Sequence, residues 1–176
     1  MRFTETSLPG VWRIELERRE DERGFFARAF DRAAFAAHAL DTDLAQLNVS
    51  HNARKGTLRG LHYQAAPHEE SKLVRCVRGA IHDVVVDVRP GSPTRGRWAS
   101  AVLTAQTRDA LFVPKGFAHG FLTLEDDTEV HYLMTDDYAP ESARGIRWDD
   151  PVLAIAWPSA PSHVAPKDLA WPPFTP

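Results

Sequence analysis

The sequence has one cysteine, Cys76, among 176 residues, so no disulfide can form within the chain. No apolar run approaches the roughly 20 residues that a membrane helix needs. The first residues, MRFTETSLPGVW, have no apolar core of the kind that a signal peptide carries. We therefore expect a cytoplasmic protein that requires neither a membrane nor disulfides.

An excess of positive charge is also missing. The formal net charge is -3, which argues against a broad nucleic-acid surface. With 26% charged and 10% aromatic residues, the composition is that of an ordinary soluble globular protein. There is no internal repeat and no linker, so we expect residues 1–176 to form a single domain with a substantial core.

Short β-strands account for most of the pattern along the chain. KLVRCVRG (72–79) alternates apolar and polar residues, and AIHDVVVDVR (80–89) is rich in β-branched residues. Four further short strands are predicted within WASAVLT (98–104), DALFVP (109–114), GFLTL (120–124) and TEVHYLMT (128–135). Many short strands at close spacing predict a sandwich or a barrel.

One segment has a helical pattern instead. DRAAFAAHAL (31–40) offers Asp31 as an N-cap, followed by strong helix formers, which predicts one short helix. From Pro151 onward the chain is rich in proline and tryptophan, so we expect no long regular element there.

The segment RGLHYQ (59–64) places polar side chains in a stretch that otherwise reads as β-sheet. A transition-metal site usually needs three protein ligands, and only His62 stands here without a His-x-His pair, so we expect no metal. Arg59, His62 and Lys72 fall within fourteen residues. On one interior face they would form an anion pocket with a base beside it. The alternatives are a solvated rim and a histidine with a purely structural role.

Sequence motifs carry the interpretation further. VPKGFAHGF (113–121) contains a Pro-x-Gly-x-x-His pattern that resembles the second half of the cupin signature. Six ordered blocks, spanning about residues 20 to 172, resemble the dTDP-4-dehydrorhamnose 3,5-epimerase family. They are DERGFF (21–26), QLNVSHNARKGTLRGLHYQ (46–64), KLVRCVRGAIHDVVVDVRPGSPTRGRW (72–98), VPKGFAHGF (113–121), YLMTDDYAPESARGIRWDDP (132–151) and KDLAWP (167–172).

This resemblance implies an all-β, cupin-type jelly roll with short peripheral helices. It also implies an isomerase of deoxysugar biosynthesis, without metal or redox cofactor, that epimerises a dTDP-linked 4-keto-6-deoxy sugar through an enolate. By resemblance His62 is the base, Tyr132 the acid and Lys72 the stabiliser of the enolate. Asp168 is the implied partner of His62, and Asp83 stays open as an alternative partner.

The same resemblance implies contacts to the substrate and to a second copy of the chain. The implied substrate-binding residues are Arg23, Phe26, Gln46, Asn48, Arg59, His119, Tyr138 and Lys167. Gln46 and Asn48 have an alternative role in strand-end hydrogen bonds, and Asp168 could be only a loop residue. We also expect a homodimer with exchanged N-terminal strands, in which Arg23 and Phe26 reach the neighbour's site.

Two positions depart from the family pattern. Arg28 and Ala143 stand where the family usually has glutamates associated with the nucleotide. The implied acid–base residues are all present, so these departures bear on the identity of the nucleotide and not on the reaction class. A single-position epimerase, acting at carbon 3 or carbon 5 alone, is an alternative that these blocks do not separate. A non-catalytic cupin-fold binding protein is a more distant one, which the presence of His62, Tyr132 and Asp168 disfavours.

Overall fold

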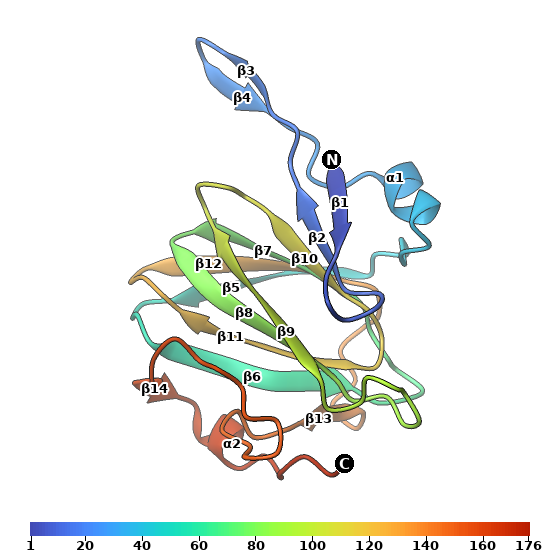
Figure 1. Ribbon diagram of the computed structural model, residues 1–176. Helices are drawn as coiled ribbons and strands as arrows, with labels where there is room; N and C mark the ends of the chain where they lie inside the picture. Colours follow the sequence, from blue (N-terminus) through green and yellow to red (C-terminus); the bar gives the residue numbers. More distant parts are fainter.

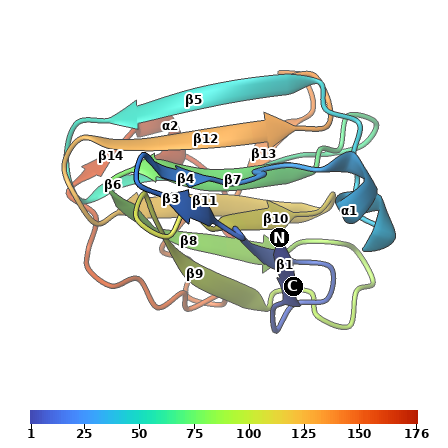
Figure 2. The same ribbon diagram turned by 90° about the horizontal axis from the view of Figure 1, so that it is seen from above.

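The computed structural model describes residues 1–176 and contains two stacked β-sheets, whose strands are seen lengthwise in Figures 1 and 2. The spatial order of the first sheet is β1 (Arg2–Glu5), β2 (Trp12–Glu15), β10 (Ala110–Val113), β7 (Lys72–Arg78), β12 (Thr128–Met134) and β5 (Gln46–Asn52). The second has the order β13 (Ala143–Gly145), β6 (Thr57–Gln64), β11 (Phe117–Thr123), β8 (Ala80–Asp87) and β9 (Trp98–Thr104), with β14 (His163–Val164) also on β6.

The architecture is the expected all-β, cupin-type jelly roll. All strand pairs within the two sheets are antiparallel except β14 with β6. The strands predicted within residues 72–135 are confirmed as β7 to β12. Strands that are neighbours in space are often distant in sequence, as where β10 lies between β2 and β7.

Apolar side chains fill the space between the sheets and also cover their outer faces. The central cluster has 13 buried residues, among them Val74, Val85 and Val130. A second cluster packs residues of the C-terminal segment, such as Leu153 and Phe174, against the second sheet. A third lies under α1 (Arg32–Ala37). Because both faces are covered, β10 and β11 are buried along their whole length.

The helices are few and short, as expected. The predicted helix is confirmed as α1, and the Asp31 side chain accepts a hydrogen bond from the backbone N–H of Ala34 at 3.0 Å. Beyond Pro151 the chain is mostly irregular, and α2 (Pro166–Leu169) begins with a proline at its first turn. No helix has the length and apolar character to cross a bilayer.

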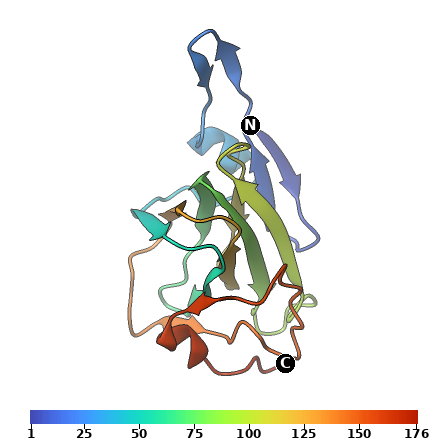
Figure 3. The same cartoon turned by 90° about the vertical axis from the view of Figure 1, so that its left-hand side faces the viewer.

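A hairpin near the N-terminus, formed by β3 (Arg19–Asp21) and β4 (Gly24–Phe26), projects from the body of the molecule (Figures 1 and 3). All of its residues are exposed, and Phe26 is 69% exposed. A two-stranded hairpin this short, with its side chains exposed, gains little stability from apolar burial.

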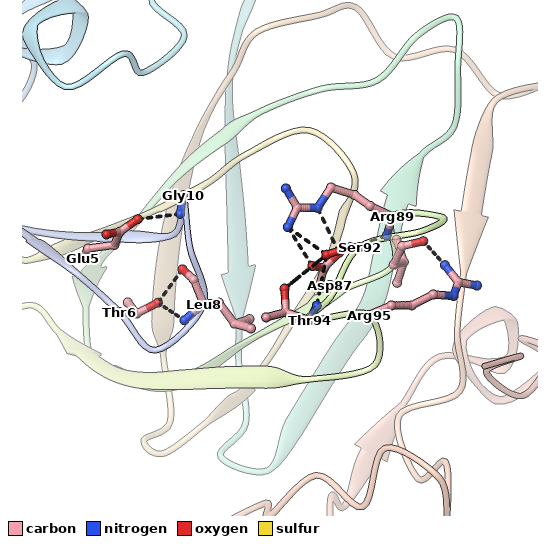
Figure 4. Close-up of polar contacts among 10 residues, drawn as sticks. Glu5, Thr6, Leu8, Gly10, Asp87, Arg89, Ser92, Thr94 and Arg95 are labelled. Atoms are coloured by element: carbon pink, nitrogen blue, oxygen red, sulfur yellow. Dashed lines mark hydrogen bonds and ion pairs between the residues drawn. The ribbon is translucent and has the colours of Figure 1, made fainter.

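The loop after β8 is organised around one buried carboxylate (Figure 4). Asp87 is fully buried and accepts hydrogen bonds from the Arg89 guanidinium at 2.7 Å and from the hydroxyls of Ser92 and Thr94, both at 2.6 Å. Arg95, from the same loop, donates to the carbonyl of Thr175 at 2.9 Å. The loop thereby fastens the C-terminal end of the chain to the second sheet.

Candidate active site

A β-bulge in β6 brings polar side chains of the segment RGLHYQ into one pocket. In a regular strand, residues three apart point to opposite faces, so Arg59 and His62 would diverge. Here His119 pairs with His62 while Phe121 pairs with Arg59, which leaves Gly60 and Leu61 opposite the single residue Gly120. The extra residue turns Arg59 and His62 into the same pocket, whereas Leu61 is fully buried in the cluster behind the sheet.

Only glycine fits at this crossing. A Cβ added to Gly60 would lie 2.6 Å from the Cα of Gly120, and Gly60 has a φ of +133°. The two backbones therefore approach more closely than any side chain would allow.

His62 and Asp168 form a hydrogen-bonded pair at the pocket wall. His62 Nε2 lies 2.6 Å from Oδ1 of Asp168, which is 1% exposed, and the Trp171 indole donates to the same oxygen at 3.2 Å. Burial raises the pKa of Asp168, but hydrogen bonds from His62, the Gly60 N–H and Trp171 outweigh it and hold that pKa below its usual value. An ionised Asp168 accepts the Nε2 proton, which leaves Nδ1 of His62 free to accept another.

Asp83 lines neither pocket and instead contacts His119, which lines the first one. Its Oδ1 is 2.7 Å from Nε2 of His119, and both side chains are buried. Of the two carboxylates that the sequence offered as partners of His62, Asp168 is the one in contact with it.

Lys72 lies at the start of β7, with its side chain 8% exposed. Its ammonium donates to the backbone carbonyl of His62 at 3.3 Å and lies 3.1 Å from Oε1 of Glu70. This places a positively charged group beside the backbone of His62.

Tyr132 comes from β12 in the opposite sheet. Its ring lies against His119 and Phe121, with centroids 6.2 Å and 6.4 Å away. Burial raises the pKa of the Tyr132 phenol well above its usual range, a hydrogen bond with Ser50 opposes this shift, and the Asp83 carboxylate adds to it. The phenol therefore stays protonated at neutral pH and can donate its proton.

These side chains surround one pocket of about 270 Å³. It is lined by Asn48, Ser50, Arg59, His62, Lys72, His119, Phe121, Tyr132, Met134, Ala165, Lys167 and Asp168. A second pocket of about 350 Å³ shares His62 and Lys167 with the first and adds Glu70, Tyr138, Ala143, Arg144 and Trp171. The shared residues make the two pockets neighbours.

Three of the expected contact residues lie outside both pockets. Gln46 contacts Asp137 at 3.3 Å through its side chain and does not line either pocket. Arg23 and Phe26 lie on the projecting hairpin, where Arg23 pairs with Asp21 at 2.6 Å. Within one chain they do not reach the site.

The sequence reading missed other lining residues. Ser50 lies two residues after Asn48 in β5, so both side chains are on the same face of the strand and line the first pocket. The period of two along a strand could have indicated this. Glu70 and Trp171 gave no such signal, because they lie outside strands and reach the site through tertiary contacts. The single cysteine has no part in the site: Cys76 is buried, and burial raises the pKa of its thiol to about 11.

Comparison with known proteins supplies the family. The model of the dTDP-4-dehydrorhamnose 3,5-epimerase family matches residues 5–175. The chain belongs to this family. A dTDP-4-dehydrorhamnose 3,5-epimerase of Sinorhizobium fredii is 45% identical over 98% of this chain and 89% of its own length.

Solved structures of the family have the same fold. A Bacillus anthracis dTDP-4-dehydrorhamnose 3,5-epimerase with TDP and PPi bound is 37% identical, with a TM-score of 0.94 over 98% of this chain and 99% of that one. A 3'-monoepimerase from Streptomyces bikiniensis in complex with dTDP-quinovose is 38% identical, with a TM-score of 0.89 over 96% and 85%. Overall similarity therefore does not separate double from single epimerases.

Proposed function

We propose that the protein epimerises a dTDP-linked 4-keto-6-deoxyhexose at carbons 3 and 5, as its family name describes. Both carbons flank the carbonyl at carbon 4, so removing a proton from either gives an enolate. Such a reaction needs a base on one face of the sugar, an acid on the other and a cation near the oxygen.

The observation that carries the proposal is the arrangement of the acid and base across the pocket. His62 belongs to β6 of one sheet and Tyr132 to β12 of the other, and both line the same pocket. A sugar between the sheets would have the imidazole on one face and the phenol on the other. His62 Nδ1 takes the proton, Lys72 stabilises the negative oxygen, and Tyr132 returns a proton from the opposite side.

Asp168 would act through His62. By accepting the Nε2 proton it fixes the tautomer in which Nδ1 is the base, and it stabilises the imidazolium that forms. We propose no metal or other cofactor, because the enolate charge has a protein cation, Lys72, beside the base.

The diphosphate and the nucleoside require further contacts. Arg59, His119 and Lys167 line the first pocket and supply cationic or donor groups for phosphate oxygens. Asn48, on the same wall, is a neutral contact. Tyr138, which is 66% exposed in the second pocket, offers an aromatic surface to the base. Gln46 would need to turn away from Asp137 to join them.

Arg23 and Phe26 fit the proposal only if a second chain is present. A homodimer that inserts the exposed hairpin into the neighbour's site would bring them to the nucleotide and cover Phe26. Light scattering at working concentration tests this: we expect a dimer. Phe26→Asp should weaken substrate binding more than Val152→Asp, which also charges an exposed apolar position but lies outside both pockets.

Proton NMR in deuterium oxide tests the reaction. With a dTDP-linked 4-keto-6-deoxyhexose we expect exchange and inversion at carbons 3 and 5, both lost in His62→Asn. Exchange and inversion at one carbon alone would instead identify a single-position epimerase, an alternative favoured by the similarity to the 3'-monoepimerase. Tight binding without any exchange would identify a binding protein.

Chelation tests the absence of a metal. Activity after dialysis against EDTA should equal that of the untreated protein. Activity that is lost on chelation and restored by zinc, iron or manganese would contradict this part of the proposal.

A further inference from the structure

Glu70 is a buried carboxylate at the boundary between the two pockets. Its side chain is 7% exposed, although it lies outside any strand. A carboxylate is rarely buried without a partner, since removing its charge from water is costly. The partner here is Lys72, whose ammonium lies 3.1 Å from Oε1 of Glu70.

The backbone holds the two side chains on the same side of the chain. Glu70 and Lys72 are two residues apart, which in extended chain places both on one face. Ser71 between them is fixed to the end of β12: its N–H donates to Oγ1 of Thr135 at 2.8 Å, and the N–H of Thr135 donates to the Ser71 carbonyl at 3.1 Å. The geometry of the pair therefore follows from the sheet and does not depend on a mobile loop.

We propose that Glu70 is a positioning residue that holds the Lys72 ammonium in place and charged for the enolate oxygen. The inference rests on the proposed function. A lysine ammonium has three N–H donors. The Glu70 carboxylate lies on one side of the ammonium and the His62 carbonyl accepts from another, which leaves a donor for the substrate.

The electrostatic surroundings make this carboxylate necessary. The other charged and titratable groups of the first pocket come from β6, β11, β12 and α2, and they are Arg59, His62, His119, Tyr132, Lys167 and Asp168. The second pocket, which Glu70 lines, adds Tyr63, Tyr138 and Arg144. The lysine and the arginines among these groups repel a charged Lys72, and Asp168 is engaged by His62. Glu70 is the one carboxylate within 4 Å of the ammonium, so without it burial and like charges would favour neutral lysine.

The neighbouring residue supplies a matched control. Glu69 is exposed, so Glu69→Gln makes the same chemical change one position away without touching the pair. In Glu70→Gln we expect the alkaline limb of kcat/KM, which reports the free enzyme, to move down by about one pH unit or more. We expect kcat to fall more than KM rises, because the oxygen carries its full charge only after proton removal.

An alkaline limb in Glu70→Gln that coincides with that of Glu69→Gln would overturn the inference. If Glu70→Gln does not fold, Glu70→Asp replaces it, and the pH dependence of Lys72 acetylation is compared with wild type. A shift of that titration to lower pH supports the role of Glu70, and an unchanged titration overturns it. Labelling does not require turnover, so an inactive wild-type protein would contradict the proposed function and leave this test intact.

Discussion

Asp168 Oδ1 lies 2.6 Å from Nε2 of His62, and the two residues reach each other across 106 positions of sequence. α2, which carries Asp168, contacts β6 at the level of the bulge, where the Gly60 N–H also faces the carboxylate at 3.4 Å. The contact determines which nitrogen of His62 is left to accept a further proton, because an ionised Asp168 accepts the Nε2 proton.

Asp168→Asn should therefore slow the exchange of substrate protons with solvent and leave nucleotide binding almost unchanged. The amide keeps the shape of the carboxylate but neither fixes the tautomer nor stabilises the imidazolium, so we expect a loss of about 10² to 10⁴-fold. Deuterium incorporation measures the rate, and binding of dTDP should change little. Asp149→Asn removes an exposed carboxylate outside both pockets and should exchange at the wild-type rate.

The sequence could predict the six strands between residues 72 and 134 but not their partners. The alternation in residues 72–78 and the β-branched run in residues 80–87 are local, so β7 and β8 were predictable. That β7 pairs with β10 and β12, and not with β8, depends on contacts between distant segments. The N-terminal hairpin is exposed on every residue, so no burial pattern marks its position.

The site was predictable only in part for the same reason. The residue types of RGLHYQ indicated a pocket, but a period of two puts Arg59 and His62 on opposite faces, and only the bulge opposite Gly120 brings them together. Choosing Asp168 over Asp83 required the position of α2. In the sequence Glu70 is one acidic residue in a polar loop, and only the folded structure shows that its side chain is buried beside Lys72.

Tyr132→Phe separates proton removal from inversion. The phenylalanine keeps the ring packed against His119 and Phe121 but has no proton to give. Because His62 lies in the opposite sheet, we expect exchange at the reacting carbons to continue while net epimerisation falls by about 10²-fold or more. Proton NMR in deuterium oxide follows both. Inversion at the wild-type rate would assign the acid to another residue.

Asp87→Asn tests the buried loop network through its pH dependence. Burial raises the pKa of Asp87, but the hydrogen bonds from Arg89, Ser92 and Thr94 outweigh it and hold that pKa well below the ordinary 3.8. A group with a depressed folded-state pKa stabilises the fold above its unfolded pKa, and this contribution is lost as the pH falls through the folded pKa. Replacing the charged acceptor should cost about 1.5 to 3 kcal/mol near neutral pH.

Urea unfolding between pH 7 and pH 2.5 measures this difference, which should be constant above about pH 5 and narrow below about pH 4. Asp149→Asn is again the control: Asp149 also pairs with an arginine two residues away, at 2.7 Å, but the pair is exposed. Its loss should cost less than about 1 kcal/mol. Equal effects of the two variants would show that burial of Asp87 does not matter.

Ala143 and Arg28 bear on the choice of nucleotide, and the structure separates their positions. Ala143 lines the second pocket with Tyr138 and Lys167. Arg28 lies beyond the hairpin, pairs with Asp31 of its own chain at 2.7 Å and reaches neither pocket. Within one chain only position 143 can contact a nucleotide bound beside Tyr138.

A carboxylate accepts hydrogen bonds from a base N–H or a ribose hydroxyl, alanine makes none, and arginine only donates. We therefore expect wild type to discriminate weakly among dTDP, UDP and CDP, and Ala143→Glu to change their relative affinities. A hydrogen bond to a charged group contributes about 1.5 to 3 kcal/mol, which corresponds to roughly tenfold or more in selectivity. Calorimetry with the three diphosphates measures it, and Ala143→Gln separates charge from size. Arg28→Glu should alter selectivity only in a dimer that brings the hairpin to the neighbour's pocket. If wild type already prefers dTDP by about a hundredfold and neither glutamate variant changes that ratio, other residues select the base.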